Sequence, residues 1–285
     1  MSTLVFCKLG GSVLTDKERP HTARPEVIAR LSGEVARALA ARPELRLALG
    51  HGSGSFGHAV ARRTGTRAGV HGAEGWQGFV QVAAEAARLN RIVADALLAA
   101  GVPAWSLAPS ALARCEAGRL VALDYEPVLE ALAHGLVPLV YGDVALDRVL
   151  GGTIVSTEQV LAYLARKLHP QRLILVSDVD GVFAGDPRRD PEAVPVPEIT
   201  EANWPEVCAA LGGSRAADVT GGMRSKVEEM MRLVQELPWL EVHILSGERP
   251  GALERVLVAP QAGAGGTVIR WGTWGNATLA KPSPW

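Results

Sequence analysis

The sequence predicts an α/β protein, a three-layer αβα sandwich in which helices cover both faces of a mostly parallel central sheet. Short apolar runs alternate along the 285-residue chain with longer stretches of helical periodicity. The apolar runs are nearly continuous, which is typical of parallel strands that are buried on both faces. Because 48% of the residues are hydrophobic, the chain can form the large core that this architecture requires.

Seven apolar runs are predicted strands and six longer segments are predicted helices. The strands are expected at residues 4–9, 45–49, 104–107, 137–141, 172–177, 242–246 and 267–270. The helices, amphipathic or rich in alanine, are expected at 25–41, 74–100, 127–134, 157–169, 222–236 and 251–258. Pro25 suits the first turn of its helix and Gly101 suits the end of the longest one. Residues 186–197 are expected to form a surface excursion or hairpin, and 262–266 a turn.

Composition and charge exclude several classes of function. The formal net charge is −1, so no global positive field attracts nucleic acid or an acidic membrane. No apolar run is long enough to span a bilayer, and the first predicted strand leaves no room for a signal peptide. Cys7, Cys115 and Cys208 are far apart and have no metal-type spacing. We therefore expect a cytoplasmic protein with reduced thiols and with neither nucleic acid nor membrane as a partner.

Lysine is rare in this chain, and its positions are informative. Of only five lysines, Lys8, Lys17 and Lys226 lie in or beside glycine-rich turns, whereas arginine is the basic residue almost everywhere else. Lysine delivers a compact charge to a single phosphate oxygen, and glycine-rich turns let backbone N–H groups approach phosphate. The combination predicts a site that holds several phosphates, and therefore phosphoryl transfer.

The glycine turns follow predicted strands, at the edge where open α/β sheets bind ligands. They are Gly10-Gly11, residues 50–57, Gly142-Asp143 and residues 178–181. Because parallel strands end at the same edge, we expect these four loops to lie together.

The second turn, Gly52-Ser53-Gly54-Ser55-Phe56-Gly57, matches the GxGxxG pattern of dinucleotide sites. It follows the second strand rather than the first, and no strand-ending acidic residue follows about twenty residues later to bind a ribose. A phosphate site with the hydroxyls of Ser53 and Ser55 is therefore the better interpretation, and a purely structural turn is the alternative. His58, which ends the turn, is interpreted as a donor to phosphate, and His51 as a packing or backbone-bonding residue.

Asp143 and Asp178 each follow an apolar strand. Such aspartates are often turn formers or helix caps, and their functional interpretation is to orient lysines or to hold nucleotide-bound Mg²⁺. Two aspartates are not a metal signature. We therefore expect Mg²⁺ to arrive with ATP, and no metal to be bound directly by the protein.

Taken together, five motifs resemble the amino acid kinase family over essentially the whole chain, and within it the isopentenyl phosphate kinases. The motifs are Lys8-Leu9-Gly10-Gly11-Ser12 with Lys17, the run from His51 to His58, Tyr141-Gly142-Asp143, the run from Ser177 to Phe183 with Asp186-Pro187, and the run from Asp218 to Lys226. The histidine that closes the second loop is the most specific of these features.

The resemblance implies an amino acid kinase-like fold and transfer of phosphate from ATP, with Mg²⁺, to a small-molecule phosphate, isopentenyl phosphate. It implies four catalytic residues: Lys8 bridging the transferred group, Lys17 stabilising its charge, His58 holding the acceptor phosphate, and Asp143 orienting Lys8. The implied ATP-binding residues are Lys8, Gly10, Gly11, Ser12, Ser53, Asp178, Gly221, Gly222 and Lys226. The implied acceptor-binding residues are Gly52, Gly54, Ser55, Gly57, His58 and Gly142, with Gly10, Gly11, Gly52 and Gly54 supplying backbone donors.

The resemblance also implies a homodimer. We expect one kinase domain, 1–285, with an acceptor-binding part at 1–171 and a nucleotide-binding part at 172–285 on one continuous sheet. An apolar tail of the acceptor is expected against Trp76, Phe79, Val82 and Ala83, with a plain core role as the alternative.

One departure from the family pattern concerns the acceptor side. A loop that often reads Ser-Gly-Asp-Asp is here Ser156-Thr157-Glu158-Gln159. Two other functions remain open: a sibling kinase for another small acid, such as a fosfomycin-type phosphonate, and a nucleotide-binding sensor or storage protein without turnover.

Overall fold

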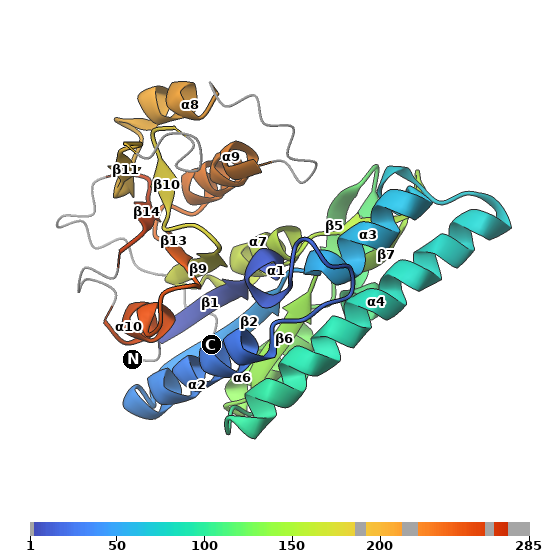
Figure 1. The fold of residues 1–285 in the computed structure, drawn as a ribbon, viewed down its shortest axis with the longest axis horizontal. Helices are drawn as coiled ribbons and strands as arrows, with labels where there is room; N and C mark the ends of the chain where they lie inside the picture. The colour runs from blue at the N-terminus through green and yellow to red at the C-terminus, as the bar shows by residue number, and fades with distance from the viewer. Residues whose placement is uncertain (1–2, 186–191, 213–221, 260–264, 273–285) are drawn as a thin grey trace.

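The computed structural model describes residues 3–185, 192–212, 222–259 and 265–272. Its main sheet contains β1 (Thr3–Leu9), β2 (Leu45–His51), β3 (Ala104–Ser106), β6 (Val137–Tyr141), β9 (Arg172–Ser177), β12 (Glu198–Ile199), β13 (Glu241–Ser246) and β14 (Thr267–Ile269). Their order is β12-β14-β13-β9-β1-β2-β6-β3, and Figure 1 labels the strands from β14 to β6. Every neighbouring pair is parallel except β13 and β14, so the predicted mostly parallel sheet is confirmed.

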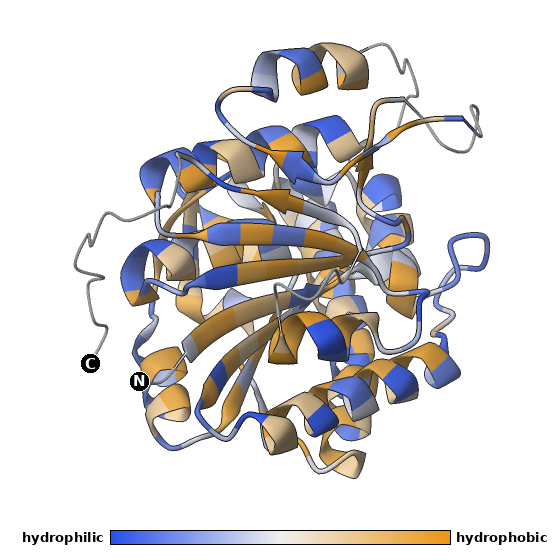
Figure 2. Ribbon diagram, turned by 90° about the vertical axis from the view of Figure 1, so that its left-hand side faces the viewer, coloured by the Kyte–Doolittle hydropathy of each residue, from blue (hydrophilic) through white to orange (hydrophobic). Residues whose placement is uncertain are grey.

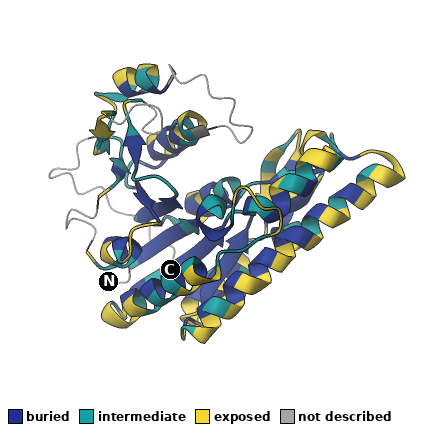
Figure 3. Cartoon of the chain, viewed as in Figure 1, coloured by how far each residue is buried: buried dark blue, intermediate teal, exposed yellow. Residues whose placement is uncertain are grey.

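Helices cover both faces of this sheet. One face packs against α2 (Pro25–Ala41), α4 (Gly72–Ala99) and α10 (Ala252–Val258); the other packs against α6 (Glu126–Ala133), α7 (Thr157–Leu168) and α9 (Gly222–Glu236). Alternation along β1 shows the reason, because Val5 and Cys7 join one core cluster while Leu4 and Phe6 join the other. The strands are buried and apolar, and the helices expose their outer faces (Figures 2 and 3). The predicted three layers are therefore confirmed.

A second sheet was not predicted. It contains β4 (Ala113–Glu116), β5 (Arg119–Leu123), β7 (Asp143–Asp147) and β8 (Gly151–Val155), in the order β5-β4-β7-β8. These strands are short and several of their side chains are exposed, so they lack the continuous apolar runs that identify the main sheet. The structure also forms a hairpin between β10 (Val182–Phe183) and β11 (Pro195–Val196), which agrees with the expected hairpin; residues 186–191 lie outside the described residues.

Short helices at the glycine turns were also missed. They are α1 (Gly11–Leu14), α3 (Gly54–Thr64), η1 (Thr66–Ala68) and α5 (Pro109–Leu112), and α8 (Trp204–Gly212) was missed nearer the carboxyl end. Glycine disfavours helix, so the run at 52–57 predicts only a turn. Burial of Phe56 and Val60 supplies the packing that makes this segment helical.

The topology brings the predicted loops to one edge. β1 lies between β2 and β9 and is parallel to both, and β6 follows β2. The turns after these strands therefore share the carboxyl edge, as predicted. The sheet also runs without a break across the expected division between residues 171 and 172.

In the described parts of the chain, no helix is both long and apolar enough to cross a lipid bilayer. Cys7, Cys115 and Cys208 are free, and the first two are buried. Burial raises the pKa of both buried thiols, that of Cys115 to about 11, so they remain protonated and unreactive at neutral pH.

A buried carboxylate joins the amino-terminal and carboxyl-terminal parts of the sandwich. Glu34 of α2 is fully buried and accepts hydrogen bonds from the backbone N–H groups of Gly251 (3.0 Å) and Leu253 (3.1 Å) at the start of α10. Arg30 donates to the same carboxylate at 2.8 Å. Glu34 therefore supplies partners that the first turn of α10 lacks within the helix.

We predict that Glu34→Ala lowers the free energy of unfolding by about 2–3 kcal/mol, because it removes the buried partner of several donors. Urea denaturation followed by circular dichroism measures the effect. Glu26→Ala, at an exposed position of the same helix, is the control and should cost less than about 1 kcal/mol. Equal losses in the two variants would contradict this role of Glu34.

Candidate active site

The two glycine turns of the amino-terminal part touch each other. A Cβ at Gly11 would lie 2.4 Å from the backbone nitrogen of Gly54, and one at Gly52 would lie 2.8 Å from the nitrogen of Gly11. Thr15 fastens this contact, since its Oγ1 donates to the Gly11 carbonyl at 2.7 Å and accepts from the Ser55 N–H at 2.9 Å. Only glycine permits this approach, which fixes the start of α1 against the start of α3.

The backbone donors at this contact differ in part from those predicted. The N–H of Gly10 binds the Val176 carbonyl (2.9 Å) and that of Gly52 binds the Leu9 carbonyl (3.0 Å), because strand pairing continues past the strand ends. The predicted roles of Gly10 and Gly52 as backbone donors to phosphate are therefore wrong in this conformation. Gly11 and Gly54 begin helices, where the first N–H groups have no intrahelical partner, so they remain suitable donors.

Ser53 and Ser55 also have different environments from those predicted. The hydroxyl of Ser53 donates to the Gly142 carbonyl at 3.0 Å. The Oγ of Ser55 is buried and has no hydrogen-bond partner among the described residues, so it does not face the open site. The N–H groups of Gly57 and Gly142 bind Ser53 and His51 carbonyls, which gives both glycines a structural role here.

Lys8 is paired with Glu158. Lys8 lies near the end of β1 and Glu158 in the first turn of α7, and both side chains are largely buried, 12% and 16% exposed. Burial by itself raises the pKa of Glu158, but the charge and hydrogen bond of Lys8 outweigh it and lower that pKa. Glu158 therefore stays ionised and fixes the ammonium group of Lys8.

The predicted contact between Asp143 and Lys8 is wrong. The carboxylate of Asp143 accepts from the backbone N–H groups of Ser110 (3.1 Å) and Val144 (2.8 Å) instead. Asp143 begins β7 and is 2% exposed, and its burial raises its pKa. Its role in this structure is to join α5 to the second sheet.

A capping box explains the position of Glu158. Ser156 Oγ accepts from the Gln159 N–H, and Gln159 Oε1 accepts from the Ser156 N–H, both at 3.1 Å. This arrangement starts α7 at Thr157 and places Glu158 in its first turn. The predicted helix at 157–169 already contained this start, but no local pattern in the sequence pairs Glu158 with Lys8.

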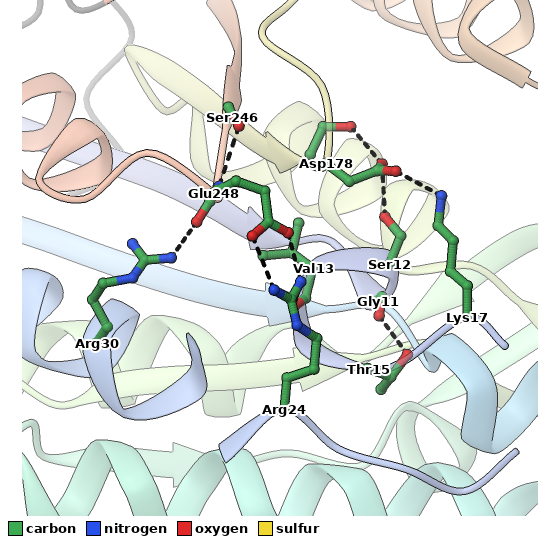
Figure 4. A network of polar contacts seen from close by, with 12 residues as sticks. Gly11, Ser12, Val13, Thr15, Lys17, Arg24, Arg30, Asp178, Ser246 and Glu248 are labelled. Carbon is green, nitrogen blue, oxygen red and sulfur yellow. Dashed lines mark hydrogen bonds and ion pairs between the residues drawn. The ribbon is translucent and has the colours of Figure 1, made fainter. Parts of the chain in front are cut away.

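Asp178 binds two side chains of the segment that follows β1, Ser12 and Lys17 (Figure 4). Ser12 Oγ donates to its Oδ1 at 2.9 Å, and Lys17 Nζ lies 2.6 Å from its Oδ2. Burial opposes ionisation of Asp178, but Lys17 and Ser12 together lower its pKa to about 2. The structure thus brings Ser12 and Asp178, both expected to bind ATP, together with Lys17, which is expected to stabilise the transferred group; these roles stay predictions.

Lys226 completes the charge cluster from α9. Burial lowers its pKa, and the positive charge of Lys8 lowers it further, while Glu158 and Asp178 act in the opposite direction. These couplings place Lys226 within electrostatic reach of both carboxylates. Gly222 begins α9, and Gly221 lies outside the described residues.

His58 lies on the exposed side of α3. The protein around it lowers its pKa by partial burial, and the charges of Arg62, Lys8 and Arg67 lower it further. His58 is therefore neutral at pH 7 and retains one N–H donor for an anion.

His51, in contrast, has no free nitrogen. Its Nδ1 donates to the Gly52 carbonyl at 3.1 Å and its Nε2 accepts from Asn90 Nδ2 at 3.1 Å. Its ring stacks on Tyr141 at 5.5 Å, and burial lowers its pKa to about 4. The predicted packing and backbone-bonding role of His51 is confirmed.

A small apolar cluster lies between α3, α4 and the second sheet. Val60, Val82 and Val144 are buried at its centre, with Ala61, Phe79, Ala83 and Ile154 packed around them. Trp76 is 38% exposed and contacts Phe79 edge-on at 5.3 Å. Val82 is thus a core residue, while Trp76 and Phe79 keep exposed surface.

A cavity of about 350 Å³ lies beside Asp178 on the carboxyl-terminal side. Asp180, Phe183, Glu248 and Arg249 contribute to its lining. Arg249 pairs with Asp180 at 2.5 Å, and Arg24 binds both carboxylate oxygens of Glu248 (Figure 4). Glu248 and Arg249 were not predicted, because no glycine motif marks the loop after β13.

The family model that matches residues 3–246 is the amino acid kinase family. The chain belongs to the amino acid kinase family. It is 35% identical to the isopentenyl phosphate kinase of Methanothermobacter thermautotrophicus, over 90% of this chain and 96% of the relative. A solved structure of an isopentenyl phosphate kinase superposes with a TM-score of 0.77 at 32% identity, covering 93% of this chain and all of that one. The product complex of the Thermoplasma acidophilum isopentenyl phosphate kinase gives 0.76 at 29% identity, covering 94% and 100%.

We predict that Gly11→Ala reduces turnover by roughly 10²-fold or more, because a methyl group would separate two helix starts whose alignment this amino acid kinase site requires. The new Cβ would meet backbone atoms, which cannot move aside as a flexible side chain can. Steady-state kinetics with ATP measures the change.

Gly33→Ala is the matched control, since Gly33 lies within α2 and its added Cβ would meet only the end of the Arg37 side chain. This variant should keep wild-type turnover, with a melting temperature no lower than that of the wild type, because alanine favours helix over glycine. Wild-type turnover in Gly11→Ala would show that the contact between the two turns does not matter for catalysis.

Proposed function

We propose that this amino acid kinase transfers the γ-phosphoryl group of ATP to isopentenyl phosphate and so forms isopentenyl diphosphate and ADP. The observation that carries the proposal is the gathering of Lys8, Lys17 and Lys226 at one sheet edge, with His58 on the adjoining helix. Similarity to isopentenyl phosphate kinases over most of the chain supports the choice of acceptor.

The charges of the site suit two phosphate-bearing substrates. Three ammonium groups, Lys8, Lys17 and Lys226, face the carboxylates of Glu158 and Asp178. Glu229, whose pKa is raised by burial and by Glu158, is coupled to the same cluster. Two unit charges about 4 Å apart interact by about 4 kcal/mol at an effective dielectric near 20. Phosphate cannot approach triphosphate at this cost unless cations lie between them.

The proposed chemistry needs no strong general base. An oxygen of the acceptor phosphate, already anionic at neutral pH, attacks the γ-phosphorus while the bond to the bridging oxygen of ADP breaks. Lys8, fixed by Glu158, and Lys17 neutralise the oxygens of the transferred group. Catalysis then consists of alignment and charge stabilisation.

Mg²⁺ would enter with ATP and neutralise part of the phosphate charge. Within the described ranges, no group of three His, Cys, Asp or Glu side chains has the arrangement of a metal site. Asp178 is the carboxylate best placed to face nucleotide-bound Mg²⁺, because it lies beside the cavity and is ionised. That the protein itself holds no metal stays a prediction.

The acceptor side combines an anion site with an apolar surface. His58 of α3 offers an N–H to the acceptor phosphate, and the exposed parts of Trp76 and Phe79 on α4 offer apolar contact to a short hydrocarbon tail. A small carboxylate or carbamate acceptor without a hydrocarbon tail would leave the apolar surface unused. A homodimer, cytoplasmic location and the acceptor and nucleotide parts of the chain belong to the same proposal.

The test is ADP release with Mg-ATP against isopentenyl phosphate, dimethylallyl phosphate, fosfomycin, carbamate and N-acetylglutamate. The proposal expects rapid turnover with the prenyl phosphates alone. Turnover with another acceptor alone would show that the proposed substrate is wrong. No ADP release with any of the five compounds would favour a nucleotide-binding sensor or storage protein.

We predict that Lys8→Ala and Lys17→Ala each lower kcat by roughly 10²-fold or more, the scale observed when one transition-state donor is lost. Steady-state turnover with isopentenyl phosphate measures both. Lys167→Ala, remote from the site and close to the rings of Tyr125 and Tyr163, is the control and should leave kcat unchanged. Near-wild-type turnover in either site variant would remove that lysine from the mechanism.

We predict that His58→Ala raises KM for the acceptor by roughly tenfold, the scale of one lost hydrogen bond to a charged group, with KM for ATP nearly unchanged. Initial rates at varied concentrations of each substrate separate the two constants. Because His58 is neutral at pH 7, His58→Gln, which retains an N–H donor, should recover part of the loss. An equal rise in both KM values would indicate a folding defect instead.

A further inference from the structure

The loop that carries Lys17 is exposed and needs an anchor. It connects α1 to α2, and its base is closed by the hydrogen bond from the Asp16 N–H to the Thr22 carbonyl (2.9 Å) and by pairing of Thr15 with Ala23. The side chain of Lys17 is 52% exposed, and its ion pair with Asp178 stabilises little at that exposure. Lys17 and His21 each lie one residue inside this closure, on opposite arms of the loop.

His21 attaches the second arm of this loop to the two neighbouring helices, α3 and α4. Its Nδ1 donates to Glu85 Oε2 of α4 at 2.7 Å, and its ring meets Phe56 of α3 edge-on at 5.9 Å. Its backbone N–H points to the Ser55 carbonyl at 3.4 Å. Figure 1 shows the loop from α1 passing beside α3 on its way to α2.

Glu85 is a buried carboxylate that the phosphoryl-transfer chemistry does not use. Its side chain is 11% exposed and lies on the inward face of α4, where its neighbours along the helix, Val82, Ala86 and Leu89, belong to the packed interior. A carboxylate is costly at such a position unless it has partners. Its partners are His21 and Arg88, and only His21 belongs to the Lys17 loop.

We propose that Glu85 and His21 are positioning residues that hold the Lys17 loop over the phosphate site. The effect on turnover rests on the proposed function, whereas the effect on the loop does not. Glu85 pairs with His21 and Arg88 and acts through His21 and the loop backbone. Loss of the pair leaves Lys17 present but misplaced, so kcat falls while the affinities for both substrates change little.

The first test reads the loop directly by limited trypsin digestion. Arg19 and Arg24 precede Pro20 and Pro25, where trypsin does not cut, so Lys17–Glu18 is the cleavable bond of this loop. We expect Glu85→Met to accelerate the appearance of the fragment that begins at Glu18 by roughly tenfold, as the loop opens locally. Mass spectrometry of the digest identifies the fragment.

Two controls separate this role from plain helix stability. Glu85→Gln keeps an oxygen that accepts from His21, and Arg88→Met removes the other partner of Glu85 without touching the loop. Methionine and glutamine are comparable helix formers, so the variants differ mainly in the acceptor. Both controls should be cleaved at the wild-type rate and should keep wild-type kcat.

The second test measures kcat and both KM values by steady-state kinetics with Mg-ATP and isopentenyl phosphate. We expect Glu85→Met to lower kcat roughly tenfold with both KM values within about twofold of wild type, because a small misplacement of a catalytic group is costly. Wild-type cleavage of Glu85→Met at Lys17–Glu18, or a lower melting temperature with unchanged kcat, would overturn the proposal. Faster cleavage in a protein that phosphorylates none of the prenyl phosphates would support the loop contact and reject the proposed function.

Discussion

The balance of charge around Lys8 is the condition on which the site depends. Three ammonium groups repel one another in a partly buried place, and they stay together because Glu158 and Asp178 remain ionised between them. Each carboxylate pairs with one lysine, Glu158 with Lys8 and Asp178 with Lys17. In the proposed function, substrate phosphates would meet a lysine, Lys8, that Glu158 already holds in place, which is the arrangement that electrostatic catalysis requires.

The fold provides this arrangement through the central position of β1. Parallel pairing with β2 on one side and β9 on the other places Lys8, the turn at Gly52 and Asp178 on one edge of the sheet. The contact between Gly11 and Gly54 then aligns the first turns of α1 and α3. Because Lys8, Gly52 and Asp178 lie at the ends of strands in one continuous sheet, their relative positions follow from strand pairing, whereas Lys17 lies on the loop between α1 and α2.

A single helix, α4, supports several parts of the site. Its first turns carry Trp76 and Phe79, which border the apolar cluster; Glu85 holds His21 of the Lys17 loop; and Asn90 donates to His51 at the end of β2. All of these residues act from one long, rigid element. The apolar cluster, the loop and the strand end are therefore held by one helix, so that a shift of α4 would affect each of them.

The sequence by itself determined the layers, the mostly parallel sheet and the positions of Lys8, Lys17 and Lys226 beside glycine turns, because apolar periodicity and residue type are local properties. The sequence did not predict the four short strands of the second sheet or the helix that begins at Gly54, because their stability comes from packing against distant segments. Only the tertiary structure decided that Lys8 pairs with Glu158, 150 residues away, and that Asp143 binds the backbone of Ser110 instead. The order of strands in the sheet decides which strand ends and helix starts lie side by side, and therefore which carboxylate pairs with which lysine. No local sequence pattern contains that order.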